Sequence, residues 1–347
     1  MLVSSLLPDW HDVEDPHALE ITRLSGALTN RVYEVRFRDP NDTKHTSRRV
    51  LLRVYGSGVD KLFSRAKELD WLRKLSAVGL GPRLLAVFGN GRLEEYFRSV
   101  TLTHDDLRDP ATSEKIAQGM AQLHKLGHTY PPPEGHKGEW PVVTREWLPQ
   151  VRRMVDTMSD AAMARLRQIL HTEQSPAALL QQLEHEIDCY EMAVARVDSP
   201  VVLCHNDLQY GNILRLRDSP DTLVLIDFEY TGYNPRGYDI ANHFCEWMAN
   251  YHGPTPHHLD AAHFPSNEEC NRFLHAYLAE SLDRPPTADE VHALWGEVEQ
   301  FIPCSHLVWA LWGLLQADRD DIDFDYLAYG AQRLCMSRQY AQQLGFW

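Results

Sequence analysis

The sequence lacks the features that would mark a secreted, membrane-spanning or zinc-stabilised protein. Its six cysteines are scattered without a C-x-x-C pair, so neither a disulfide framework nor a zinc site is predicted, and reduced thiols are expected. No run approaches the ~20 consecutive apolar residues that a membrane span requires. The opening MLVSSLLPDWHDVEDP also has no basic region typical of a signal peptide. These absences predict a cytoplasmic protein without a membrane span.

Positive charge is also scarce. The chain carries 34 lysines and arginines against 49 aspartates and glutamates, which gives a formal net charge of −15. This balance argues against nucleic acid or an anionic membrane as a partner, because both attract basic proteins. With 347 residues, 44% of them hydrophobic, the chain is long enough for one large domain or two lobes. A small-molecule substrate is the expected partner, and a cationic one would suit the charge.

Residues 1–96 have the pattern of a small β-rich lobe. Hydrophobic and polar residues alternate in 21–37 and 48–56, and an Asn-Gly turn divides a hairpin over 83–97. Between them, 64–81 has leucines at helical spacing, with a serine cap at its start and glycines at its end. We therefore expect a sheet with one helix in this part of the chain.

Residues 97–347 have mainly helical patterns. A linker near 96–100 leads into them, and a proline-rich loop interrupts them. The expected fold class is α+β, with a small β-rich N-terminal lobe and a large, mostly helical C-terminal lobe. The predicted helical segments include 111–127, 143–155, 176–197, 267–282 and 296–316.

The stretch VVLCHNDLQYGNILRLRDSPDTLVLIDFEY, residues 201–230, places three polar side chains beside short apolar runs. The runs predict strands that reverse at RDSPD. This hairpin would bring Asp207 and Asn212 to the same place as Asp227. Acids and asparagine also occur in ordinary turns, but all three between two apolar strands favour a chemical role.

These three side chains suit phosphoryl transfer. Mg²⁺ prefers hard oxygen ligands, which Asn212 and Asp227 offer, and the attacking hydroxyl needs a carboxylate such as Asp207 to accept its proton. The pattern H-x-D-x-x-x-x-N that begins at His205 matches the kinase catalytic loop. The sequence predicts a kinase that uses ATP and Mg²⁺, with His205 as a brace of the loop.

The N-terminal lobe offers a second feature of kinases. Arg53 is a cation within an apolar strand, and Glu68 lies on the following helix, which predicts an ion pair that positions phosphates. Arginine suits this task because its fork grips phosphate oxygens in two places, although a strand-edge arginine would have the same pattern. Residues 25–30, SGALTN, could form the turn over the phosphates.

The segment after the hairpin distinguishes among kinases. It reads IDFE rather than DFG, and no A-P-E segment follows, so a small-molecule kinase is favoured over a protein kinase. The segments CHNDLQYGNIL (204–214), LIDFEYTGYNPRGYDIANHFCEWM (225–248) and SHLVWALWGLLQADRDDIDFDYLAYG (305–330) strongly resemble eukaryotic choline/ethanolamine kinases, and the resemblance runs from about residue 24 to 345. It implies the protein-kinase-like two-lobe fold and ATP- and Mg²⁺-dependent phosphorylation of choline to phosphocholine, a step of phosphatidylcholine biosynthesis. It also implies a homodimer.

The resemblance assigns roles to individual residues. It implies Asp207 as the base, with Asn212 and Asp227 as catalytic metal ligands. The loop at 25–30 departs from the family's usual Gly-Gly-x-Ser-Asn, with Thr29 in place of the serine. The ATP-binding residues that it implies are Arg53, Glu68, Thr29, Asn30, Glu95 and Gln209, and the substrate-binding residues are Asn206, Glu229, Tyr230, Glu246, Tyr251, Trp309, Trp312 and Tyr329.

The aromatic members of this set concern the choice of substrate. The quaternary ammonium of choline has no N–H, so hydrogen bonds to the nitrogen cannot select it, whereas aromatic faces and a nearby carboxylate can. Trp309 and Trp312 lie at i and i+3 of one predicted helix, a spacing that is also typical of an apolar core. The resemblance places them, with Tyr329, in a choline cage, and the Cys-Glu-Trp at 245–247 is similar to the choline branch of the family.

Other functions stay open. An ethanolamine kinase, or an aminoglycoside-type small-alcohol phosphotransferase, would share the catalytic pattern, but the second would have no use for the aromatic set. A catalytically inactive kinase-like scaffold would not need all three polar residues of the hairpin. His124 and His306 are interpreted as structural.

Overall fold

The chain divides into two compact units, and the structure, a computed structural model, describes residues 2–24, 30–38, 47–56, 64–319 and 323–347. The first unit is Met1–Thr101 with Gly211–Tyr230, and the second is Leu102–Tyr210 with Thr231–Trp347. The units therefore do not follow the linear division expected at residues 96–97. Strand pairing is the reason, because a strand near residue 100 pairs with a strand of the segment 211–230.

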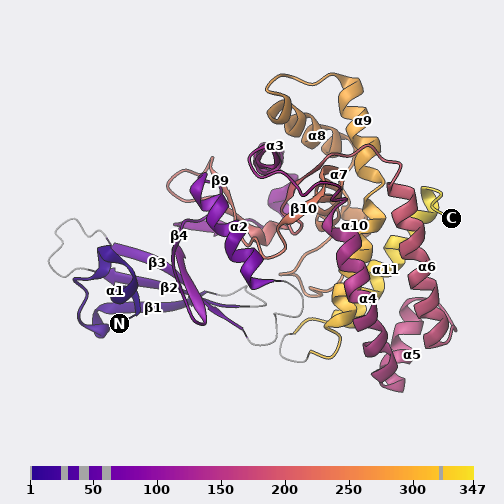
Figure 1. The fold of residues 1–347 in the computed structure, drawn as a ribbon, viewed down its shortest axis with the longest axis horizontal. Coiled ribbons are helices and arrows are strands. Elements are labelled where there is room, and N and C mark those ends of the chain that lie inside the picture. Colours follow the sequence, from indigo (N-terminus) through magenta and orange to yellow (C-terminus); the bar gives the residue numbers. More distant parts are fainter. Residues whose placement is uncertain (1, 25–29, 39–46, 57–63, 320–322) are drawn as a thin grey trace. The chain divides into compact units, whose positions relative to one another are not determined.

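The first unit contains a five-stranded antiparallel sheet with the strand order β1-β2-β3-β5-β4 (Figure 1). The strands and the hairpin predicted from the alternation are present. At the β4–β5 turn, a Cβ on Gly91 would lie 2.4 Å from the carbonyl oxygen of Arg53, which explains the glycine there. The strand bounds are Leu19–Leu24 for β1, Asn30–Arg38 for β2, Ser47–Tyr55 for β3, Leu84–Phe88 for β4 and Gly91–Glu95 for β5.

The predicted helix of this unit is α2 (Arg65–Ala77), and it begins at its serine cap. The Ser64 side chain accepts a hydrogen bond from the backbone N–H of Lys67, which satisfies one of the unpaired donors of the first helical turn. The residues that α2 buries are Glu68, Trp71, Leu72 and Leu75.

A short helix that the sequence did not predict, α1 (Leu2–Leu6), opens the chain. With the turn that follows, it covers apolar side chains of the five-stranded sheet, so the opening apolar run belongs to the core of this unit. The core residues are Val3, Leu7, Trp10 and Val13, packed with Val35, Phe37, Val50 and Leu93.

The segment 211–230 forms the predicted hairpin. Strand β8 (Ile213–Leu216) pairs antiparallel with β9 (Leu223–Leu225), and β6 (Ser99–Thr101) pairs with the other edge of β8. The preceding apolar run, β7 (Val201–Cys204), belongs to a different sheet, since it pairs with β10 (Gly232–Pro235) in the second unit.

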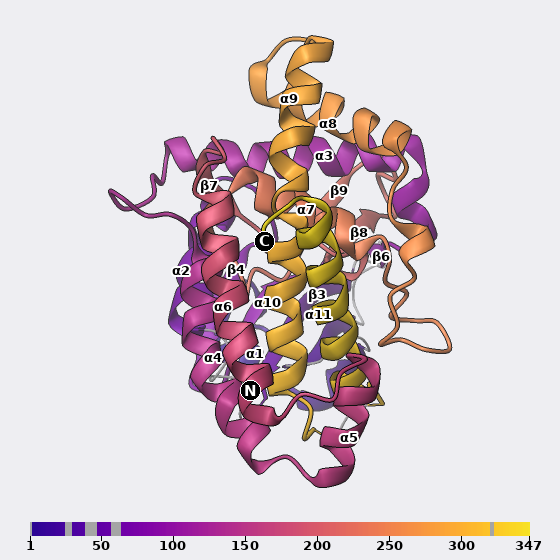
Figure 2. The same ribbon diagram turned by 90° about the vertical axis from the view of Figure 1, so that its right-hand side faces the viewer.

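The second unit is mainly helical. Its helices α4, α6, α10 and α11 lie side by side (Figure 2). The helical pattern predicted over 296–316 is divided by a break at Gln300 and Phe301 into α9 and α10. The helix bounds are Pro110–Lys125 for α3, Glu139–Thr157 for α4, Asp160–Ile169 for α5, Pro176–Val194 for α6, Arg236–Glu246 for α7, Asn267–Leu282 for α8, Ala288–Glu299 for α9, Ile302–Leu315 for α10 and Tyr326–Gln343 for α11.

Helices α10 and α11 approach each other closely at a pair of glycines. A Cβ added to Gly313 would lie 2.9 Å from the Cα of Gly330, so the two backbones meet there without side chains between them. Neighbouring positions of the same helices carry the tryptophans and the tyrosine of the predicted cage.

Among the residues that the structure describes, none of the helices is both long and apolar enough to cross a membrane.

Candidate active site

Asn212 and Asp227, the predicted metal ligands, are brought together by the β8–β9 hairpin. The backbone N–H of Ile226 donates to the carbonyl oxygen of Asn212 at 3.0 Å, directly beyond the paired strands. Asn212 is buried, whereas Asp227 is half-buried and has a φ of 66°. A left-handed backbone at a non-glycine residue is uncommon and costs energy, so it is typical of a functional position.

Arg53 of β3 contacts Asp227, one of the two predicted ligands. Its Nη1 lies 3.4 Å from Oδ1 of Asp227, and its Nε donates to Oε1 of Glu94 at 3.1 Å. Burial opposes the charge of the guanidinium, but the carboxylates of Glu94 and Asp227 outweigh it and raise the pKa of Arg53. Arg53 is therefore a charged, buried side chain and not a strand-edge arginine.

The predicted ion pair of Arg53 with Glu68 is wrong. Within the described residues, Glu68 pairs with Arg92 of β5 at 2.7 Å and with Arg65 of its own helix at 2.6 Å. The partner of Arg53 on the sheet is Glu94. The sequence suggested the direct pair because it is the usual arrangement of kinases, but two residues of β5 stand between the helix and Arg53.

In the second unit, the loop after β7 carries Asp207 and is held by Asp239 of α7. The backbone N–H groups of His205 and Asn206 donate to the two carboxylate oxygens of Asp239 at 2.9 and 2.7 Å. Asn206 has a φ of 65°, so the loop turns sharply just before Asp207. Asp207 itself is half-buried.

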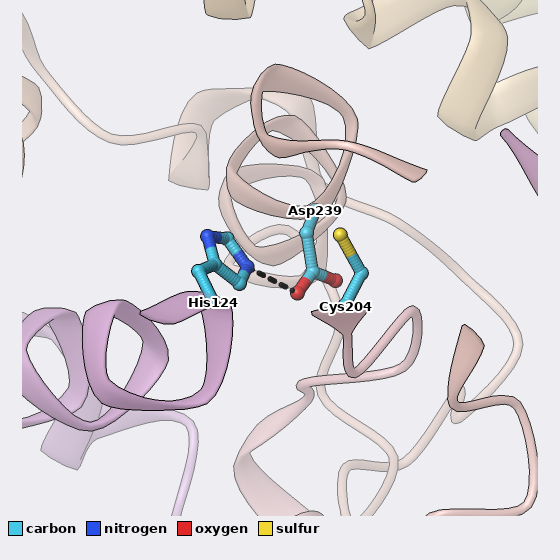
Figure 3. Close-up of side chains that lie close together, drawn as sticks. All are labelled: His124, Cys204 and Asp239. Atoms are coloured by element: carbon cyan, nitrogen blue, oxygen red, sulfur yellow. Dashed lines mark hydrogen bonds and ion pairs between the residues drawn. The ribbon is translucent and has the colours of Figure 1, made fainter. Parts of the chain in front are cut away.

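His124 completes this support from α3. Its Nε2 lies 3.0 Å from Asp239 (Figure 3). Its Nδ1 lies 2.8 Å from the Tyr277 hydroxyl. Burial raises the pKa of the Asp239 carboxyl, but the hydrogen bond from His124 and the nearby charges outweigh it, so the pKa is lowered. The interpretation of His124 as structural agrees with these contacts.

Cys204 lies beside His124 and Asp239, and the three could in principle hold a metal ion (Figure 3). Burial raises the pKa of its thiol well above the ordinary value, and a protonated thiol is a poor metal ligand. The thiol donates instead to the carbonyl oxygen of Asn234 at 3.4 Å. We interpret the three residues as a brace of the catalytic loop.

Two further side chains of α7 hold the same loop. His243 Nδ1 donates to the carbonyl oxygen of Leu208 at 2.7 Å, and Asn242 donates to the carbonyl oxygen of Asn206 at 3.1 Å. The indole N–H of Trp247 donates to His243 Nε2 at 3.2 Å, so the imidazole must be neutral to make both bonds. Burial lowers the pKa of His243 to about 4, which is consistent with that state.

The predicted aromatic residues of α10 and α11 form one cluster. The ring centroids of Trp309 and Trp312 lie 5.4 Å apart, and those of Trp312 and Tyr329 lie 6.0 Å apart. Phe324 connects Tyr251 to this cluster. The ring centroid of Phe324 lies 6.4 Å from that of Tyr251 and 5.4 Å from that of Tyr329. The indole N–H of Trp309 donates to Asn242 at 2.7 Å, so the cluster and the catalytic loop share one hydrogen-bonded residue.

Glu246, the predicted acid of the cage, is buried next to this cluster with its charge already balanced. Arg333 of α11 forms an ion pair with it, and the Tyr251 hydroxyl donates to it at 2.6 Å. Arg333 also donates to the Tyr329 hydroxyl at 3.1 Å. His306 Nδ1 lies 3.2 Å from the same guanidinium, and burial, with the charge of Arg333, lowers the pKa of His306 well below its ordinary value, as a structural role requires.

The remaining predicted residues belong to both units of the chain. Glu95 forms an ion pair with Arg83 at 3.2 Å, and Gln209, Glu229 and Tyr230 are half-buried. Thr29 and the side chain of Asn30, like the rest of the loop at 25–29, lie outside the described residues. The site-related residues that sequence reasoning missed are Arg92, Glu94, Asp239, Asn242, His243 and Arg333. The signal for those on α7 was the number of polar residues among apolar ones in a helix that is buried from Gly237 to Glu246.

Comparisons with known proteins agree with this architecture. The family model for choline/ethanolamine kinase matches residues 21–338. A probable choline kinase 2 of Arabidopsis thaliana is 38% identical over 95% of this chain and 88% of its own length, and a human choline/ethanolamine kinase is 34% identical over 97% and 82%. The solved structure of an ethanolamine kinase of Plasmodium vivax is 28% identical, with a TM-score of 0.76 over 95% of this chain and 85% of that chain. The chain is thus a kinase of the choline/ethanolamine kinase family, with the protein-kinase-like fold of that family.

Proposed function

We propose that this enzyme transfers the γ-phosphoryl group of ATP to choline and so forms phosphocholine for phosphatidylcholine synthesis. The observation that carries the choice of choline is the buried aromatic cluster of Trp309, Trp312 and Tyr329 in a chain with an intact H-x-D-x-x-x-x-N motif. Aromatic faces attract a quaternary ammonium that offers no hydrogen-bond donor.

The charge of Glu246 supports the same choice. Ethanolamine carries a primary ammonium, which binds best where carboxylate oxygens accept its N–H groups. The Glu246 carboxylate already accepts from Arg333 and from the Tyr251 hydroxyl, so the ammonium of ethanolamine would have to compete with these two donors. Choline binds mainly through contact of its quaternary ammonium with aromatic faces, so it suits the cluster better than ethanolamine does. We include Asn206, Glu229 and Tyr230 among the substrate contacts, as the family resemblance implies.

Asp207 acts as the base in the proposed reaction. Its carboxylate takes the proton of the choline hydroxyl as that oxygen bonds to the γ-phosphorus, while the bond to the bridging oxygen breaks and ADP leaves. Asp239 and His243 hold the loop of Asp207 from the backbone side, which fixes the base in place before the substrate binds.

Asn212 and Asp227 offer an amide oxygen and a carboxylate on adjoining backbone, a donor set that fits Mg²⁺. Bound Mg²⁺ would neutralise charge on the phosphate oxygens during transfer. Arg53, with its charge maintained by Glu94, would bind phosphate. The other proposed ATP contacts are Thr29, Asn30, Glu95 and Gln209, and Glu68 would act only through Arg92.

Two further proposals rest on the same reading. We place the reaction in the cytoplasm, because all six cysteines are free and reduced thiols are typical of that compartment. We also propose a homodimer, as the family resemblance implies.

The test is ATP- and Mg²⁺-dependent product formation with choline, ethanolamine and an aminoglycoside at matched concentrations. We expect choline to be phosphorylated fastest. Asp207→Asn should lower kcat by about a thousandfold with the fold unchanged, because positioned general bases contribute on this scale. A faster reaction with an aminoglycoside would reject the proposed substrate class, and a fully active Asp207→Asn variant would reject the proposed base.

A further inference from the structure

We propose that Arg92 is a positioning residue for phosphoryl transfer, which holds Arg53 in place through Glu94 and links it to Glu68 of α2. This inference rests on the proposed function of Arg53 as a phosphate-binding residue. The usual kinase device, a strand cation paired directly with a helix glutamate, is replaced here by a relay through two residues of β5.

The register of the sheet creates the need for such a relay. Arg53 and Arg92 are directly opposite each other on β3 and β5, so two guanidinium groups project from the same face of neighbouring strands. Glu94 lies two residues from Arg92 on that face, and its Oε1 accepts from Nε of Arg53 at 3.1 Å and from Nε of Arg92 at 2.5 Å. One carboxylate oxygen therefore separates and binds both cations.

The relay continues to the helix. Arg92 reaches Oε1 of Glu68 at 2.7 Å, and Arg65 of α2 reaches the other oxygen of Glu68 at 2.6 Å. At the opposite end of this row of contacts, Arg53 contacts Asp227. Three arginines therefore alternate with three carboxylates, in the order Arg65, Glu68, Arg92, Glu94, Arg53 and Asp227. The charges balance along the whole chain of contacts.

Burial makes this balance important. The exposed fractions are 2% for Arg92, 3% for Glu94 and 1% for Glu68, so water cannot compensate for a missing partner. Arg92 and Arg53 both lower the pKa of the Glu94 carboxyl despite its burial. Without Arg92, Glu94 would bind Arg53 alone, and we expect that stronger pair to draw the guanidinium away from Asp227.

The experiment compares Arg92→Met and Arg92→Lys by the KM for ATP, the KM for choline and kcat, with thermal unfolding as a check. Arg92→Met should reduce kcat/KM for ATP by about tenfold or more while the KM for choline stays unchanged. Arg92→Lys keeps the charge and should recover part of the loss. Arg49→Met is a matched control, because Arg49 lies on the same strand β3 and pairs with Glu34 at 3.2 Å, outside the relay.

A double-mutant cycle distinguishes the relay from a purely structural role. If Arg92 acts through Arg53, adding Arg92→Met to Arg53→Met should change kcat/KM for ATP by less than about twofold, whereas independent residues give additive losses. Additive losses, or an Arg92→Met enzyme that is less stable but keeps its ATP kinetics, would overturn the proposal. If Arg53→Met itself leaves the ATP kinetics intact, the proposed role of Arg53 fails instead. If Arg92→Met does not fold, the cycle is run with Arg92→Lys.

Discussion

His243 supports the catalytic loop only while its imidazole is neutral. Nδ1 donates to the Leu208 carbonyl oxygen next to Asp207, and Nε2 accepts from the indole of Trp247. A proton on Nε2 would place two donors face to face in a buried site. The support of the loop is therefore tied to the protonation of one residue.

This residue predicts a pH dependence of stability. The pKa of His243 is lowered from 6.5 to about 4 in the folded chain, so as the pH falls through that range the unfolded chain binds the proton first. The contribution to stability is complete above pH 6.5 and is lost toward pH 4, on the order of 3 kcal/mol at most. The lowered pKa of Asp239 acts in the same direction at lower pH.

Urea unfolding at pH 7 and pH 5 measures this dependence. We expect the wild type to lose more unfolding free energy between the two pH values than His243→Gln does. His258→Gln, at an exposed histidine, should behave as the wild type. Equal losses in the wild type and His243→Gln would show that His243 is not the group responsible.

At the scale of elements, the crossing of α10 and α11 decides the shape of the aromatic cluster. Trp309 and Trp312 come from one helix and Tyr329 from the other, and Gly313 and Gly330 let the two backbones touch. A side chain at this crossing would push the helices apart. The cluster would then open between Trp312 and Tyr329.

Gly313→Ala tests that argument. Its Cβ would lie 2.9 Å from the Cα of Gly330, and such overpacking against backbone costs about 1–3 kcal/mol. We expect a lower melting temperature and a higher KM for choline, with the KM for ATP unchanged. Gly296→Ala in α9 is the matched control, since nothing lies within 4 Å of its Cβ, and it should gain about 0.5–1 kcal/mol from its better helix propensity. A Gly313→Ala protein as stable as this control would contradict the close crossing.

For the whole molecule, the features predictable from the sequence are those with local causes. Strand alternation, the serine cap of α2 and the reversal at RDSPD each depend on neighbouring residues, and all three are present. The reversal at RDSPD also brings the backbone of Asn212 next to that of Ile226, beside Asp227. The pairing of β7 with β10 could not be predicted from local patterns. The strand that follows β7 in the sequence is β8, but β8 pairs with β6 and β9, and β7 pairs with the more distant β10.

The missed site residues have the same explanation. Glu68 was expected to form an ion pair with Arg53, but the β3–β5 register places Arg92 and Glu94 between the two side chains. Arg333 is 87 residues from Glu246, and no local pattern indicates that a buried arginine will neutralise that acid. Registers and helix crossings are set by packing of the whole chain, so charge partners that depend on them appear only in the structure.

The most direct test of the proposed function is the ratio of kcat/KM for choline to kcat/KM for ethanolamine, in the wild type and in Trp312→Phe. If the aromatic cluster binds the quaternary ammonium, the wild-type ratio lies well above one. The smaller ring of phenylalanine should lower this ratio mainly through the choline term. A wild-type ratio at or below one, or a ratio that Trp312→Phe leaves unchanged, would contradict the assignment of the cluster to choline.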